Sequence, residues 1–305
     1  MDPPPCNRAK MNEAATEKHE YLTVRELADL LRIKERKVYD LAANGEVPCS
    51  RATGKLLFPA AEVRAWIEKA KSGGAVEDSE RPAIFLGSHD PLLDWAIRQS
   101  RCGLATFFDG SHDGLSRFAA DEGVATGLHI YEPKTSDWNA EAAESAAAGK
   151  NAVLLTFATR KRGIVFGSGL PHPSSLKDLA GLRVVPRQPE SGTANLFEQL
   201  AGQHGLDLKD ITLTDVARTE DDAVQLVRQG EAEATFGLES VALTYGLSFQ
   251  PVIEERFDIL VDRKAWFDPP LQKLIKFCQT EAFRHRAESA LGYDVSGFGQ
   301  VVWNG

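Results

Sequence analysis

The sequence predicts an α/β protein in two parts, a small helical module followed by a larger module of strands and helices. Three observations predict it. Apolar residues recur at helical spacing within residues 21–70, a polar stretch with two adjacent glycines fills residues 71–81, and short apolar runs alternate with amphipathic stretches over residues 82–305. We therefore expect a linker at 71–81. The alternation that follows it is typical of an α/β fold with mainly parallel sheets.

The composition is that of an ordinary globular protein, with 43% hydrophobic and 26% charged residues among 305. No apolar run approaches the roughly 20 residues of a membrane span. Residues 1–20 lack the basic-then-apolar order of a signal peptide. We expect a disordered leader there, a cytoplasmic protein and no membrane partner.

The cysteines show neither a CxxC pair nor a histidine at ligand spacing; they are Cys6, Cys49, Cys102 and Cys278. Their spacing argues against a disulfide framework and against a zinc site. We expect isolated reduced thiols, no metal and no cofactor.

The net charge of −9 is unevenly distributed along the chain. Residues 21–70 hold nine Lys or Arg and seven Asp or Glu, whereas residues 82–305 hold 21 and 30. Only charges within a Debye length act on a bound polyanion. The acidic larger module is therefore no objection to nucleic-acid binding by the smaller one.

The sequence of the small module predicts two short helices joined by a tight turn. Thr23 and Glu26 have the spacing of a capping box. The first helix is expected to bury one face, made of Val24, Leu27, Ala28, Leu30 and Leu31. The second is expected to bury Val38, Leu41 and Ala42 and to end by a left-handed cap at Asn44-Gly45. Two such helices form a helix-turn-helix unit.

In such a unit the N-terminal residues of the second helix reach base edges in the major groove. Its outer side here carries Lys34, Arg36, Lys37 and Tyr39. Two short strands predicted within residues 47–59, around Thr53-Gly54, add Arg51 and Lys55 as a basic hairpin tip. A third helix over residues 60–69 closes the core with Val63, Trp66 and Ile67. These elements predict binding to double-stranded DNA.

The order of these elements resembles the excisionase-like, winged members of the MerR-type helix-turn-helix superfamily. The matching residues are Tyr21-Leu22-Thr23, Glu26-Leu27-Ala28, Leu30-Leu31, Val38-Tyr39, Gly45-Glu46-Val47-Pro48, Phe58 and Ala65-Trp66-Ile67. Lys34 departs from the family, which usually has Ser or a similar cap at that position.

Four predicted strand-to-helix junctions of the larger module combine glycine or hydroxyl residues with a helix start: residues 87–91, 109–114, 187–193 and 237–240. Helix N-termini carry unpaired N–H groups and the positive end of the dipole, which suit an anion. A single junction of this kind is more often an ordinary cap. Several converging across a cleft would hold a tetrahedral oxyanion with neutral donors.

Residues 82–305 resemble the periplasmic-binding-protein-like sensor domains that are fused to helix-turn-helix modules. The type is that of molybdate- and tungstate-binding proteins, related to LysR-type effector domains. The segments that carry the resemblance are Gly87-Ser88, Gly110-Ser111 with Gly114-Leu115, Gly127–Ile130, Arg162–Ile164, Arg187-Gln188 with Ser191–Thr193, Gly237–Glu239, Phe257–Val261, and Leu291–Asp294 with Gly299.

The resemblance implies a two-lobed, type II periplasmic-binding-protein-like domain with its ligand between the lobes. Residues 152–166 would lead into the second lobe and residues 252–261 would lead back. By position, the donors would be Ser88 and Ser111 from lobe one, and Gln188, Ser191, Gly192 and Thr193 from lobe two. His129, Arg160 and Arg187 are further candidates, and His89 departs from a plain hydroxyl or amide loop. The implied effector is molybdate or tungstate.

Other interpretations stay open. The same architecture would also serve to sense a small organic acid or a molybdenum-cofactor-like compound. For an enzyme, Ser88-His89-Asp90 and Ser111-His112-Asp113 are no triads, because adjacent side chains point in different directions. The sequence has no HExxH and no phosphate-binding glycine motif after a strand, so we expect no catalysis. We expect a homo-oligomer, a dimer or tetramer, because one small module rarely gives specific DNA affinity.

Overall fold

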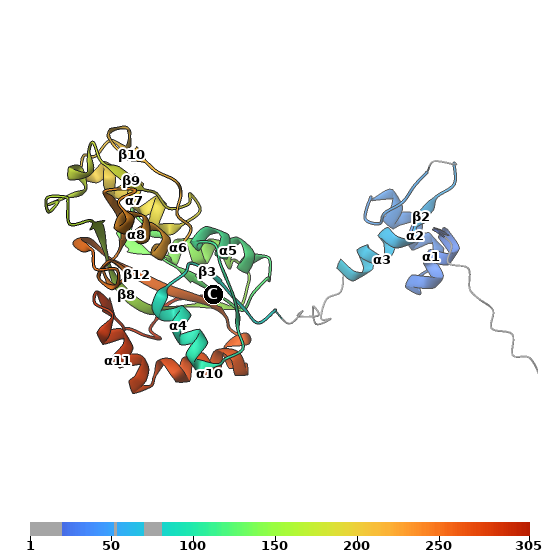
Figure 1. Cartoon of the computed structure of the whole chain (residues 1–305). Coiled ribbons are helices and arrows are strands. Elements are labelled where there is room, and N and C mark those ends of the chain that lie inside the picture. The colour runs from blue at the N-terminus through green and yellow to red at the C-terminus, as the bar shows by residue number, and fades with distance from the viewer. Residues whose placement is uncertain (1–19, 52–53, 70–80) are drawn as a thin grey trace, which may run out of the picture. The chain divides into compact units, whose positions relative to one another are not determined.

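Figure 1 shows the structure, a computed structural model that describes residues 20–51, 54–69 and 81–305. The chain divides at residues 79 and 80 into two compact units, and each is described by itself. The predicted leader and linker, apart from Glu20 and Arg81, lie outside the described residues, as does Thr53 of the predicted hairpin. The α/β class predicted from the sequence is confirmed.

The first unit is mainly helical and contains β1 (Tyr21–Thr23), α1 (Val24–Leu31), α2 (Glu35–Ala43), β2 (Leu57–Pro59) and α3 (Ala60–Lys69). The predicted capping box starts α1: the backbone N–H of Glu26 donates to Thr23 Oγ1 (3.3 Å), and that of Thr23 donates to Glu26 Oε2 (2.8 Å). Helix α2 begins at Lys34, whose side chain makes no capping hydrogen bond.

The core of the first unit lies between the three helices and β2, with Leu27, Val38, Phe58 and Val63 fully buried. The prediction that Leu30 faces this core is wrong, because Leu30 is 52% exposed. The buried stripe of α1 follows the i, i+3, i+4 positions from Val24 to Leu31, and Leu30 lies on its flank.

The predicted pair of strands within residues 47–59 forms only in part. Ser50 and Leu57 exchange backbone hydrogen bonds of 2.7 and 2.9 Å, but only residues 57–59 make a strand. That strand, β2, pairs antiparallel with β1, so that Leu22 lies opposite Phe58. On the other side of the bridge, Pro48 has no N–H to extend a ladder.

The second unit is built on one ten-stranded sheet in the order β10-β9-β11-β8-β12-β5-β3-β4, with β13 and β14 pairing with β8. Its strands are β3 (Ile84–Gly87), β4 (Ala105–Phe108), β5 (Ala125–Leu128), β8 (Ala152–Phe166), β9 (Arg183–Val185), β10 (Thr212–Leu213), β11 (Ala234–Leu238), β12 (Ser248–Asp262), β13 (Tyr293–Asp294) and β14 (Val301–Asn304). A separate two-stranded sheet joins β6 (Tyr131–Glu132) to β7 (Asp137–Trp138).

The two long strands β8 and β12 run antiparallel and connect two lobes (Figure 1). In lobe one β12 also pairs with β5, and in lobe two β8 also pairs with β11. The sheet is mixed, because β4, β3 and β5 are parallel to one another, and so are β10, β9 and β11, but the crossing strands are antiparallel. Strand β8 is continuous from Ala152 to Phe166. The buried arginines between its apolar runs, Arg160 and Arg162, form ion pairs with carboxylates outside the strand, among them Asp90 and Glu220.

Helices cover both faces of this sheet in each lobe. Lobe one carries α4 (Pro91–Ser100), α5 (Ser111–Ala119), α6 (Ala140–Ala146), η3 (Ala265–Phe267), α10 (Pro269–Cys278) and α11 (Glu281–Ser289). Lobe two carries η1 (Leu176–Leu179), α7 (Gly192–Gln203), η2 (Leu208–Asp210), α8 (Glu220–Gln229) and α9 (Glu239–Thr244). Neighbouring residues of β3 face opposite sides: Phe85 packs with α4 and α10, and Leu86 with α5 and α6.

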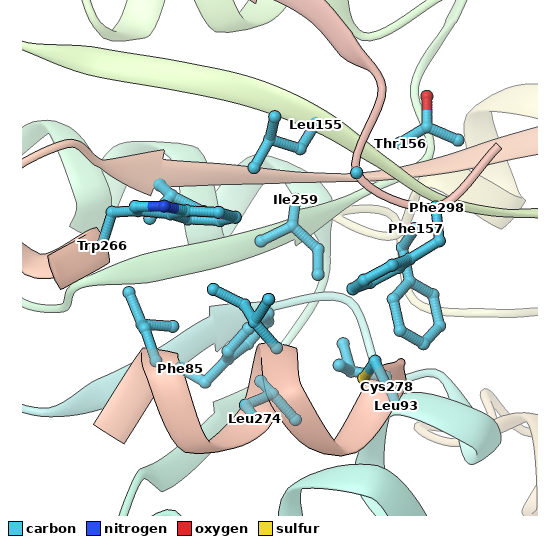
Figure 2. Close-up of a pocket in the computed structure, with 14 residues that line it drawn as sticks. Phe85, Leu93, Leu155, Thr156, Phe157, Ile259, Trp266, Leu274, Cys278 and Phe298 are labelled. Carbon is cyan, nitrogen blue, oxygen red and sulfur yellow. The ribbon is translucent and has the colours of Figure 1, made fainter. Parts of the chain in front are cut away.

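The core of lobe one contains a cavity of about 30 Å³ (Figure 2). Phe85, Leu155, Ile259, Trp266 and Leu274 are among its lining side chains, which are almost all apolar. A cavity of this size and lining offers no polar partners to a ligand or a water molecule. It is a packing void between the sheet and α10.

Candidate functional site

The six residues predicted to contact DNA are all exposed on the first unit: Lys34, Arg36, Lys37, Tyr39, Arg51 and Lys55. Four of them come from the start and the outer side of α2. Tyr39 is 54% exposed, so its aromatic ring faces solvent and is not part of the core. An exposed basic helix with an aromatic side chain is a surface on which a nucleic acid can bind.

A groove runs between α2 and the hairpin. Tyr39, Arg51 and Lys55 line it together with Arg25 and Glu35, whereas Arg36 and Lys37 are not part of its wall. Sequence reasoning missed Arg25. The available signal was its place in the first turn of α1, directly after the cap residue Thr23, where its side chain cannot enter the core.

In the second unit, two predicted donors of lobe one meet at the ends of β3 and β4. Ser88 and Ser111 are buried, and their Oγ atoms lie 2.7 Å apart. Ser111 Oγ also accepts the backbone N–H of His129 over 3.1 Å. A bond between two hydroxyls uses one of their two hydrogens, so one hydrogen remains for a further acceptor.

The lobe-two junction at the start of α7 packs on Gly110, which precedes Ser111, and on His129. A Cβ atom at position 110 would lie 2.8 Å from the carbonyl oxygen of Glu190, and one at position 192 would lie 2.6 Å from that of His129. Gln188 donates through Nε2 to the backbone oxygen of Asp109 over 3.0 Å. The two lobes are therefore closed on each other where the sequence predicted a ligand between them.

Ser191 is used as the N-cap of α7. Its Oγ accepts the N–H of Ala194 (3.1 Å) and donates to the carbonyl oxygen of Gln188 (2.7 Å). Its hydroxyl hydrogen is thus committed within the loop, and the ordinary capping role accounts for this residue. The Oε1 atom of Gln188 is buried and has no hydrogen-bond partner among the described residues.

A buried chain of ion pairs crosses between the lobes beside this junction. Arg160 contacts Asp90 (2.7 Å) and Glu255; Arg162 contacts Glu255 and Glu220, each over 2.8 Å; and Arg187 contacts Glu220 over 3.0 Å. Arg160, Arg162, Asp90 and Glu255 are each no more than 1% exposed. Three guanidinium groups balance three carboxylates, which is the condition for burying so many charges.

Two carboxylates of this chain of ion pairs, Glu220 and Glu255, stay ionised in spite of their burial. Burial raises the pKa of Glu220, but Arg162 and Arg187 outweigh it and bring that pKa to about 2. Burial likewise opposes ionisation of Glu255, yet Arg160 and Arg162 hold its pKa well below the usual range. His129 Nδ1 lies 3.2 Å from Glu255 Oε2 without hydrogen-bond geometry, and burial lowers the pKa of His129. His129 is neutral at pH 7.

This chain of ion pairs changes the role expected of two predicted residues. The terminal nitrogens of Arg160 are turned to Asp90 and Glu255, so this side chain does not present them between the lobes. Arg187 and Thr193 both contact Glu220, the latter through Oγ1 over 3.2 Å, on the lobe-two side. His89 packs edge-on against Phe108, with ring centroids 5.6 Å apart.

Four residues of this chain of ion pairs were not predicted as site residues, namely Asp90, Arg162, Glu220 and Glu255. Arg162 was quoted only as part of the resemblance, and Glu255 belongs to a charged run, Glu254-Glu255-Arg256, that looks solvent-exposed in sequence. The available signal was the alternation of Arg160 and Arg162 inside an apolar strand, which places both on one face.

Within the described residues, no three His, Cys, Asp or Glu side chains are grouped as a metal site, and no helix is long and apolar enough to cross a bilayer. Cys49, Cys102 and Cys278 form no disulfide, and Cys6 lies outside the described residues.

Comparison with known proteins gives two domain matches. Residues 95–279, more than half of the chain, match the family described as a PBP superfamily domain, and residues 21–71 match a helix-turn-helix domain. A curated relative, the uncharacterized protein YvgK of Bacillus subtilis (strain 168), is 24% identical over 313 residues, which is 96% of this chain and 99% of the relative.

Solved structures give weaker matches. A putative phosphate ABC transporter substrate-binding protein with bound phosphate from Clostridium perfringens is 12% identical over 68% of this chain and 96% of its own, with a TM-score of 0.49. The CcmR regulatory domain of Synechocystis PCC6803 in complex with 2-PG is 10% identical over 64% of this chain and 93% of its own, with a TM-score of 0.48. At these values neither match bears on the ligand of this chain.

Proposed function

This chain belongs to the PBP superfamily domain family, and we propose that it is a ligand-responsive transcription regulator. It would bind double-stranded DNA through its N-terminal helix-turn-helix domain and an oxyanion, molybdate or tungstate, between the lobes of its larger domain. The observation that carries the proposal is the joining of these two domain types in one chain. One unit offers an exposed basic helix, and the other offers two lobes able to close on a small ligand.

The closed junction supports an oxyanion as the ligand. Ser111 and Gly192 are the first residues of α5 and α7, and Gly110 contacts the loop before Gly192, so one helix N-terminus from each lobe lies at this junction. Ser88, which follows β3, contacts Ser111 there. Positive helix ends and a spare hydroxyl hydrogen would receive an oxyanion without a bare cation. The nearby arginines are already neutralised by carboxylates.

Regulation requires that the ligand binds one conformation better than another. We propose that the oxyanion enters an open form and replaces the direct Gly110–Glu190 and Gly192–His129 contacts with contacts to itself. The resulting change of lobe geometry would alter how two or more DNA-binding modules of a homo-oligomer are spaced on DNA.

A panel of ligands tests the sensing step. Molybdate, tungstate, sulfate, phosphate and small carboxylates are added to the full chain, and the melting temperature is measured. A ligand at 100 times its Kd adds about 2.7 kcal/mol of stability. Absence of a shift with both molybdate and tungstate contradicts the oxyanion assignment. Turnover of an ester or phosphate substrate would contradict the non-catalytic assignment.

DNA mobility-shift assays with and without the stabilising ligand test the regulatory step. A change of apparent DNA affinity by the ligand is the expected outcome. Equal affinity in its presence and absence would contradict the switch while leaving DNA binding itself in place.

A further inference from the structure

Lobe two contains a second cavity of about 270 Å³, formed between β9, the first turns of α7 and the segment around β10. Its apolar lining includes Val185, Phe197, Leu213, Val216 and Phe236. Every residue that lines it lies between positions 184 and 236, so the cavity belongs to lobe two alone. Ser88 and Ser111 are not part of its wall.

The polar lining is concentrated in Arg187, Thr193, Thr214 and Glu198. Thr214 Oγ1 is buried and has no hydrogen-bond partner among the described residues. An unpaired buried hydroxyl is unfavourable, and a bound group that pairs with it removes that cost. Glu198, in contrast, is exposed, and solvent can screen its charge at the rim.

Arg187 is held in a fixed orientation by contacts on its other side. Its Nη1 lies 3.0 Å from Glu220 Oε1, its Nε donates to the carbonyl of Ala217 (3.1 Å), and its Nη2 donates to that of Arg218 (2.7 Å). A guanidinium has five N–H donors, so these three contacts leave two hydrogens for another acceptor. The side chain needs no reorganisation to accept one, which favours binding.

Arg187 and the first turn of α7 both lie at this cavity. Glu220 is the carboxylate between Arg162 and Arg187, and the latter guanidinium is largely buried. Thr193 occupies the first turn of α7, where the helix dipole is positive. A carboxylate placed there meets a cation and a helix N-terminus.

We propose that this cavity is a second ligand site, for a small amphipathic carboxylic acid with an aromatic or branched apolar body. The carboxylate accepts from Arg187, with the unpaired hydroxyl of Thr214 beside it, and the body packs between Phe197, Phe236 and Val216. An apolar cavity of roughly 150 Å³ holds one benzene molecule. A cavity of about 270 Å³ therefore has room for one ring and a head group.

This site goes beyond the proposed oxyanion sensing and does not depend on it. Its position is regulatory, because Arg187 joins it to the buried chain of ion pairs through Glu220. A carboxylate bound to Arg187 competes with Glu220 for the same cation. The ligand would in this way reach the crossing strand β8 through Arg162.

Calorimetry on the full chain tests the proposal with benzoate, phenylacetate and isovalerate as probes. Benzamide is the neutral analogue of benzoate, and molybdate is the probe of the other site. We expect at least one carboxylate to bind and benzamide to bind roughly tenfold more weakly, as loss of a charge-assisted hydrogen bond requires. Failure of all three carboxylates, or equal binding of benzamide, overturns the proposal. Neither result affects the molybdate arm.

Two matched pairs of variants locate the site. Val216→Trp fills the mouth of the cavity from a position that is 54% exposed, and Val301→Trp makes the same change at a 62% exposed position on β14 that lines no part of it. The first should abolish binding of the carboxylate and the second should leave it unchanged. Unchanged binding by Val216→Trp overturns the proposal.

Thr214→Val removes the unpaired buried hydroxyl of the cavity without changing the shape, and Thr212→Val is its control at an exposed position outside the lining. We expect a roughly tenfold loss of carboxylate affinity for the first variant only. Equal effects of the two variants contradict the assignment of the head group. Light scattering on Val216→Trp measures the oligomeric mass. A change of this mass would identify the exposed Leu213 and Val216 as part of a protein interface, and it would overturn the proposal.

Discussion

Glu255 is the residue on which the buried charges of this protein depend most. It is fully buried, and its two oxygens receive guanidinium groups from both Arg160 and Arg162. These arginines alternate along β8, so a single carboxylate from the neighbouring strand β12 can reach both. Removing it leaves two buried cations that share the remaining carboxylates, Asp90 and Glu220.

Glu255→Gln should therefore destabilise the protein by about 3–5 kcal/mol, the cost of breaking a buried ion pair from one side. Urea unfolding at pH 7 measures the change. Glu233→Gln serves as the control, because Glu233 pairs with the half-exposed Arg183 at the surface and should matter little. Equal losses in the two variants would contradict the assigned role of Glu255.

Glu220 predicts a dependence of stability on pH. Its pKa is about 2 in the folded protein against the usual 4.5, so the folded state favours its charged form. Its contribution to stability is complete above pH 4.5 and is lost as the pH falls toward 2. The difference in unfolding free energy between the wild type and Glu220→Gln should therefore shrink over this range. A difference that is constant from pH 7 to pH 2.5 would contradict the prediction.

Helix α2 starts without a side-chain cap. Lys34 stands at its N-cap with extended backbone angles (φ −76°, ψ 146°) but offers no acceptor to the first turn. Helix α1 shows the contrast, since Thr23 caps it with a reciprocal pair of hydrogen bonds. A cation at a helix N-terminus also opposes the dipole. Lys34 therefore lowers the stability of the helix. A contact between Lys34 and a DNA phosphate would give a functional reason for a lysine at this position.

Lys34→Ser should move stability and DNA binding in opposite directions. An added N-cap stabilises the first unit by about 1 kcal/mol, and the lost cation weakens DNA binding and lowers its salt dependence. Thermal unfolding and mobility shifts at two salt concentrations measure the two effects. Unchanged DNA affinity would contradict the assigned phosphate contact.

The loop before α5 contacts lobe two, so we expect a substitution in this loop to change the stability of the protein. Gly110 has φ +112°, and a Cβ there would lie 2.8 Å from Glu190 O. Gly103 has φ +85° with open space around it, so the control Gly103→Ala carries the backbone cost of about 1 kcal/mol without the clash. Gly110→Ala should lose more stability and have a larger radius of gyration by X-ray scattering. Identical behaviour of the two variants would show that the lobes do not need this contact.

The proposed DNA contacts and the proposed ligand contacts of this protein lie in different units of the chain. Replacing Arg36 and Lys37 together by Ala should weaken DNA binding roughly tenfold, because two phosphate contacts are lost, and should leave ligand-induced stabilisation intact. Ser111→Ala should leave ligand-free DNA affinity intact and abolish the ligand response. Mobility shifts and thermal shifts on both variants check this, and loss of both activities in either variant would contradict the separation.

Much of the fold could be predicted because it depends on local patterns. The capping box at Thr23, the apolar stripe of α1 and the strand-to-helix junctions after β3 and β9 are all visible in the sequence and present in the structure. The error at Leu30 has a physical reason. Periodicity places a residue on one side of a helix, but only the neighbouring elements determine how wide the buried stripe is.

By itself, the sequence determined the two modules, the α/β class and the basic exposed helix, since these follow from hydrophobic period, capping residues and local charge. The resemblance of the surrounding junctions also indicated Ser88 and Ser111 as donors from lobe one. The tertiary structure alone brought Asp90, Glu220 and Glu255 to the arginines of β8, and Arg187 and Thr193 to the wall of a cavity. These residues are far apart in the chain, and no local pattern encodes which long-range partner neutralises a buried charge.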